Sequence, residues 1–156
     1  MRDRRFVAVH RGGPLDVVEH RILAAWAADC AEHVLTLFAE SSSDDRPRRA
    51  IEVARAWARG EVSVGDAQKA ALGAHAAARA MTSNSATAAA RTAGHAVATA
   101  HMADHCLGAS LYALKAVEAT GASADGERAW QVEQLPDEVR ELIVSALESR
   151  RTVLCP

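Results

Sequence analysis

Two pairs of polar residues have the spacing that places side chains next to each other on an α-helix. His101 and His105 are four residues apart, Asp29 and His33 are also four residues apart, and Asp104 directly precedes His105. Residues at i and i+4 share one helix face, where two imidazoles can bind one metal ion or a histidine can pair with a carboxylate. The sequence therefore predicts that any chemistry of this protein resides at these positions.

Three interpretations of the two pairs are open. One is a structural hydrogen-bond network between two helices, which stabilises a fold only when all its members are satisfied. Another is a pocket for a small molecule or partner, with the candidate residues Asp29, His33, His101, Asp104, His105 and Trp26. The third is a metal site with the candidate ligands His33, His101 and His105. We expect no metal and no cofactor, and Met102 occupies the position where the H-E-x-x-H metalloprotease motif requires Glu.

The polar pairs lie on or near the apolar stripes of their segments, which a turn of about 100° per residue would direct inward. We therefore expect the two pairs to converge between the first helix and the central helix. In that arrangement His33 and His101 would lie within about 12 Å, the reach of a shared ligand or a bridging water.

The longest helical segment should be 85–117, which is rich in Ala and contains no Pro. It carries the second polar pair and is expected to be a long central helix, either as one kinked rod or as two helices that meet near Gly108. Apolar spacing and capping residues predict the other helices at 15–39, 46–59, 64–81 and 128–134, and a last one that begins at Pro136. The expected fold is all-α, a compact bundle of about six helices.

We expect one domain over residues 1–156, with an N-terminal arm at 1–14 and a flexible loop at 121–127. Hydrophobic residues make up 49% of the chain but aromatic residues only 4%, so small side chains should pack the helices closely. Because 18 basic and 20 acidic residues nearly balance, nucleic acid is not an expected partner. No segment approaches the roughly 20 apolar residues of a membrane span. The three cysteines, an odd number, favour a reducing cytoplasm.

No complete catalytic motif occurs in the sequence. The nucleophile elbow, the Walker motif and the dinucleotide-binding glycine pattern are all missing. Neither Cys30 nor Cys106 has an adjacent base that would favour a thiolate. The sequence therefore favours a protein without enzymatic activity.

Three stretches of the chain resemble one protein family. They are AADCAEH at 27–33, DDRPRRAIE with ARAW at 44–57, and AGH with HMADH at 93–105. The chain is similar here to small all-helical immunity proteins of the immunity-protein-five-like type, which belong to bacterial polymorphic-toxin systems. The resemblance implies a cytoplasmic protein that binds and neutralises a cognate toxin without catalysis or a cofactor. The alternative is a small-molecule-binding protein or a metal-dependent bundle enzyme, with a role in self-resistance or biosynthesis, that uses the His/Asp pocket.

Overall fold

Helices account for nearly all regular structure in the computed structural model, which describes residues 2–154 and their side chains through Arg150. The chain forms eight α-helices in this part, with one isolated β-bridge and no strand. Their bounds are α1 Val17–Val34, α2 Thr36–Ala39, α3 Arg46–Ala58, α4 Val64–Arg79, α5 Asn84–Ala98, α6 His105–Ala119, α7 Ala124–Glu133 and α8 Asp137–Leu154. The all-α prediction is confirmed, and the expected number of about six helices was too low.

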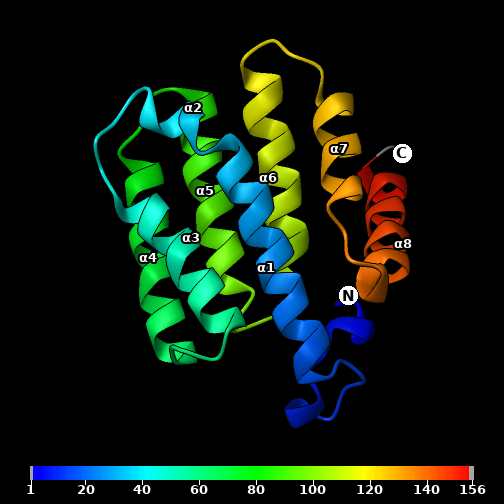
Figure 1. The fold of residues 1–156 in the computed structure, drawn as a ribbon. Coiled ribbons are helices and arrows are strands. Elements are labelled where there is room, and N and C mark those ends of the chain that lie inside the picture. Colours follow the sequence, from blue (N-terminus) through cyan, green and yellow to red (C-terminus); the bar gives the residue numbers. More distant parts are fainter. Residues whose placement is uncertain (1, 155–156) are drawn as a thin grey trace.

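The segment does not form one long central helix, and the alternative of two helices is correct: it forms α5 and α6, which pack side by side (Figure 1). The chain turns at residues 99–104 rather than at Gly108. At this point the Thr99 hydroxyl donates to the His95 carbonyl oxygen, and the amides of Ala100 and His101 bond three residues back instead of four. These tighter bonds end α5. The sequence does not reveal this turn, because the apolar residues of the Ala-rich segments on both sides keep the same helical spacing.

The helix expected at 15–39 is divided in the same manner. Asp16 caps α1 by accepting a hydrogen bond from the Glu19 amide at 2.8 Å. At the other end, the Leu35 amide bonds to the Glu32 carbonyl, three residues earlier, and the short α2 follows. The remaining helices agree with the sequence more closely, except that α7 begins at Ala124 rather than at residue 128 because the Ser123 side chain caps it.

Small residues fill the centre of the bundle. The central helix α5 contacts α1, α3, α4 and α6, and alanines form most of its buried face (Figure 1). Only a few large side chains are fully enclosed, among them Trp26 and Phe38. This composition lets helix backbones approach closely, as expected from a chain with few aromatic residues.

The N-terminal arm packs against the lower end of the bundle in Figure 1, which we call the base. It forms two 3-10 turns, Arg4–Phe6 and Val9–Arg11, and buries Phe6. Hydrogen bonds join the Val9 amide to the Leu15 carbonyl and the Leu15 amide to the Val7 carbonyl, at 2.8 and 3.0 Å. Gly13 is required where the arm folds back, because a Cβ there would lie 2.1 Å from the Val7 carbonyl oxygen. The arm is therefore a fixed part of the base.

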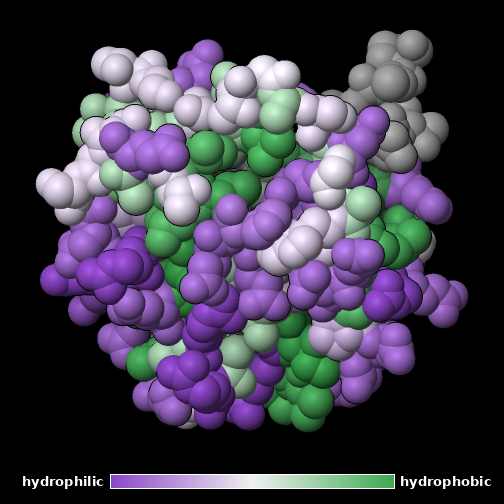
Figure 2. Space-filling view, turned by 45° about the horizontal axis from the view of Figure 1, so that its top comes forward, coloured by the Kyte–Doolittle hydropathy of each residue, from purple (hydrophilic) through white to green (hydrophobic). Residues whose placement is uncertain are grey.

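The face seen when the top of the molecule is tilted forward has a mixed surface (Figure 2). Figure 2 brings the top of Figure 1 forward and shows mostly hydrophilic residues, with hydrophobic residues in separate strips and small areas. Among the described residues, no helix is long and apolar enough to cross a lipid bilayer.

Candidate functional site

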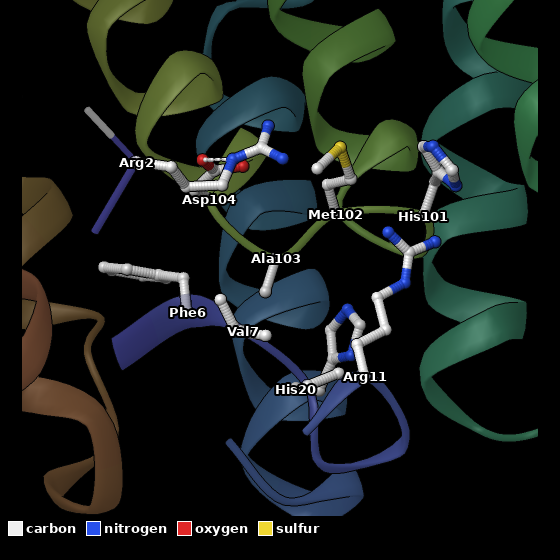
Figure 3. Close-up of a pocket in the computed structure, with 10 residues that line it drawn as sticks. Arg2, Phe6, Val7, Arg11, His20, His101, Met102, Ala103 and Asp104 are labelled. Carbon is white, nitrogen blue, oxygen red and sulfur yellow. Dashed lines mark hydrogen bonds and ion pairs between the residues drawn. The ribbon is translucent and has the colours of Figure 1, made fainter. Parts of the chain in front are cut away.

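The N-terminal arm closes a small cavity at the base of the bundle (Figure 3). Its volume is about 90 Å³. The arm, α1 and the turn between α5 and α6 supply its walls, which consist of Arg2, Phe6, Val7, Ala8, Arg11, His20, His101, Met102, Ala103 and Asp104. Two residues predicted from sequence, His101 and Asp104, thus lie at one cavity.

A larger hollow lies next to this cavity. It has a volume of about 550 Å³ and shares four residues with the small cavity: Ala8, Arg11, His20 and His101. Trp57 from α3 and Val17 and Val64 from the first turns of α1 and α4 also line it. We call this space the basal hollow. Its walls are mainly apolar, with a few polar groups at defined positions, which is the usual composition of binding sites.

His20 forms part of the wall between the two spaces. Its Nε2 lies 2.6 Å from the Thr99 carbonyl oxygen, and its ring packs against Trp57 with centroids 4.7 Å apart. A carbonyl only accepts hydrogen bonds, so Nε2 carries the proton and donates it. Burial lowers the pKa of His20. The side chain is therefore a neutral imidazole whose Nδ1 remains an acceptor.

His101 and Asp104 bind different partners at the base. The His101 Nδ1 lies 3.1 Å from the Gln68 amide nitrogen, so it accepts a hydrogen bond from α4. Asp104 forms an ion pair with Arg2 at 2.9 Å, which ties the arm to the start of α6 (Figure 3). Both side chains consequently position the arm and the turn.

The α1 pair points toward other helices. Asp29 forms an ion pair with Arg55 of α3 at 2.8 Å. His33 lies 2.8 Å from the Glu127 carboxylate of α7 and stacks on Trp130 with ring centroids 3.5 Å apart. These contacts join α1 to α3 and α7, as a structural network would.

The structure therefore does not gather the predicted site residues in one place. The α1 pair contacts α3 and α7, whereas His101 and Asp104 contact α4 and the arm. Trp26 is buried and donates its indole N–H to the Gln131 carbonyl oxygen at 2.9 Å. Asp29 and His33 do lie on one helix, α1, as the i, i+4 spacing predicted. The spacing does not apply to the second pair, because His101 lies in the turn at 99–104 and His105 begins α6. A ligand role for any of these residues stays a prediction.

His105 belongs to a row of three histidines that the sequence did not reveal. Its Nδ1 lies 3.2 Å from the Nδ1 of His95, and the His95 ring is T-shaped against His75 at a centroid distance of 5.4 Å. Tyr112 stacks on His95 at 5.0 Å. One of the two facing Nδ1 atoms must carry a proton and the other must accept it. The row crosses α4, α5 and α6.

Burial keeps this row uncharged at neutral pH. It lowers the pKa of all three histidines, and for His95 the pKa falls to about 4, with the nearby His105 and His75 as further causes. No group of three or more His, Cys, Asp or Glu side chains within the described residues could hold a metal ion. The arrangement is thus a neutral aromatic contact between helices.

Two glycines create the space for the histidine row. A Cβ at Gly94 would lie 2.6 Å from the His75 ring, and a Cβ at Gly108 would lie 2.7 Å from the His95 Nδ1. These glycines were the sequence signal that could have revealed the histidine row, because Gly within an Ala-rich helix indicates that another group lies close to its backbone. For His20, the signal was its place three residues before Leu23 on the buried stripe of α1.

We expect Gly108→Ala to lower the free energy of unfolding by about 1–3 kcal/mol, because overpacking displaces the His95 ring. Urea denaturation measures this loss. Gly126→Ala on α7 is the matched control: nothing lies within 4 Å of its added Cβ, so it should stabilise the protein by about 0.4–1 kcal/mol. If the close approach to His95 is the cause, Gly108→Ala should cost much less in a His95→Ala background. An equal cost in both backgrounds would rule it out.

A third space lies between α6, α8 and the arm. It is an open groove of about 850 Å³ whose apolar floor includes Leu107, Leu111 and Ala146, and His95 lies in its wall. Arg150 and Lys115 contribute positive charge. The two described cysteines, Cys30 and Cys106, are unpaired and buried, and burial raises the pKa of both thiols. They do not supply a nucleophile to this groove or to the base.

The architecture is that of an all-helical protein with a filled interior and several hollows at its surface. Residues 13–138 match the model of the family described as "Imm-5 like putative immunity protein". Because the match covers most of the chain, the protein belongs to this family. No curated protein and no solved structure matches the chain.

Proposed function

We propose that this protein is a bacterial immunity protein that binds a cognate protein toxin in the cytoplasm and blocks it without catalysis. Family membership over residues 13–138 carries this proposal. The polar residues that first suggested chemistry are engaged in contacts between helices, as the pairs Asp29–Arg55 and His33–Glu127 illustrate. These contacts between helices are consistent with a rigid scaffold that presents a surface to a partner protein.

Co-expression with the toxin encoded beside this gene tests the proposal. We expect cells that produce the toxin to survive only when this protein is also produced, and the two proteins to co-purify as a stoichiometric complex. An inactive toxin variant does not kill the cells that produce it, so the complex can be prepared from them. Survival without a complex, or a complex that fails to protect, would contradict neutralisation by direct binding.

The α6–α8 groove supports a second candidate function, the binding of a small molecule. Its volume of about 850 Å³ is within the range of ligand pockets, and the neutral His95 provides a hydrogen-bonding group in an apolar wall. Thermal denaturation in the presence of metabolites and antibiotics tests it, since a ligand that binds only the folded state raises the melting temperature with dose. A dose-dependent shift that Leu111→Trp abolishes would favour this function over immunity.

A further inference from the structure

Exposed apolar side chains are concentrated at the base. Four of the large exposed hydrophobic residues stand there, namely Val9, Val17, Val18 and Val64, with exposed fractions of 57%, 55%, 61% and 39%. Three of them, Val9, Val17 and Val64, line the basal hollow. Single exposed apolar residues are common on protein surfaces, but several around one hollow indicate an interaction site.

The basal hollow has the form of a pocket that could receive one anchoring side chain of a partner protein. Its floor includes Trp57 and the neutral His20, whose rings are already in contact. The arm that forms one side is held by the backbone hydrogen bonds between Val9 and Leu15. A preformed pocket that takes one apolar side chain from a partner is typical of the centre of a protein interface, where most of the binding energy is found.

Charges at the rim indicate the chemistry of the partner. Asp16, which lines the hollow, caps α1. Two acidic residues close to Val64 in the sequence also have partners within the protein: Asp66 belongs to the capping box of α4, and Glu61 pairs with Arg59. Glu19 stands in the first turn of α1, where the helix dipole favours a negative charge, but burial and the neighbouring Asp16 raise its pKa.

The basic groups at the rim are not balanced in this way. Within the part of the chain that the structure describes, Arg11 and Arg21 form no ion pair. Arg11 extends along the wall shared by the two spaces (Figure 3), and Arg21 lines the adjacent shallow groove that also contains Val18. The two guanidinium groups are therefore available to pair with carboxylates of a partner.

We propose that the basal hollow is the toxin-docking site and that it receives an apolar side chain flanked by carboxylates on the toxin. This inference rests on the proposed immunity function and specifies its surface. The apolar side chain would replace water against Trp57 and the valines. The two arginines would pair with the flanking carboxylates and speed association.

The sharpest test places negative charge in the hollow without disturbing the helices. Val17 and Val64 are the first residues of α1 and α4, where Glu interacts favourably with the helix dipole. We expect Val17→Glu/Val64→Glu to keep the melting temperature and to weaken binding to the inactivated neighbouring toxin by about 30-fold or more in calorimetric titration. Val17→Gln/Val64→Gln, which adds no charge, should weaken binding less.

Leu72→Glu is the matched control. Leu72 lies on α4 as Val64 does and is 71% exposed, but it does not line the hollow. We expect this variant to bind within about twofold of the original protein. Replacement of Arg11 and Arg21 by Gln should lower the association rate and reduce its dependence on salt.

The outcomes separate the two proposals. If the original protein binds the toxin and the Val17/Val64 variants bind equally well, the docking site is wrong and the immunity function stands. The same conclusion follows if Leu72→Glu alone abolishes binding. If the original protein neither binds nor protects, the proposed function fails and the docking site fails with it.

Discussion

Replacement of Trp26 by Ala is expected to lower the free energy of unfolding by about 3–5 kcal/mol, the usual cost of removing a large buried aromatic residue. Trp26 is only 1% exposed and is the largest fully buried side chain among the described residues. The buried cluster that contains Trp26 is rich in alanines, which have no rotamers with which to fill a cavity. The Gln131 carbonyl oxygen would also lose its indole donor.

Urea denaturation followed by circular dichroism measures this change. Trp26→Phe restores much of the volume and should recover more than half of the loss, since only the hydrogen bond and part of the ring are missing. Trp130→Ala serves as a control, because Trp130 is only half-buried and stacks on the exposed His33, so its removal should cost less than that of Trp26. A loss below about 1 kcal/mol for Trp26→Ala would contradict its role as the main core residue.

Helix positions were accessible from the sequence where local chemistry defines the ends. The capping box of Ser63 and Asp66 and the Pro47 position near the start of α3 predicted two helices to within two residues. The turn between α5 and α6 was not accessible, because Thr99 and His101 have no property that distinguishes them from helix interiors. Bonds three residues back and the Thr99 hydroxyl create that turn.

The candidate site could be predicted from the sequence only in part, for a related reason. Spacing alone found His101 and Asp104, both of which lie at the base. It could not show that Arg2 and Gln68 from distant segments would bind them. The basal hollow depends on how the arm, α1, α3 and α4 come together, and a sequence period contains no information about such long-range packing.

The alanine-rich core and the buried histidines have a common consequence for acid stability. Burial is the main cause of lowered pKa values for His20, His75, His95 and His105. For His95, the pKa in the folded protein is about 4, compared with about 6.5 for an exposed histidine. Between these values the unfolded chain binds a proton that the folded protein does not bind.

The sign of the effect follows from this difference. Stability is complete above about pH 6.5 and is lost as the pH falls toward 4, by at most about 1.4 kcal/mol per pH unit for each such histidine. Ion-paired carboxylates such as Asp44, whose pKa is lowered by Arg46, act only at still lower pH. Between pH 6.5 and 4.5 the histidines therefore lower the stability as the pH falls, whereas Glu19, whose pKa is raised by burial and by the neighbouring Asp16, contributes with the opposite sign. The contribution of His95 is the difference in slope between the original protein and a His95 variant.

We expect the free energy of unfolding to decrease steadily between pH 7 and pH 5, and His95→Gln to flatten this decrease by up to about 1.4 kcal/mol per pH unit. Urea denaturation at half-unit steps of pH measures both slopes. His10→Gln, an exposed position on the arm, controls for the substitution itself. His95→Gln also loses the contacts with His105 and Tyr112, so its stability at pH 7 should be lower while its slope is smaller. A parallel downward displacement of the whole curve, with the slope unchanged, would show that His95 already titrates normally in the folded protein.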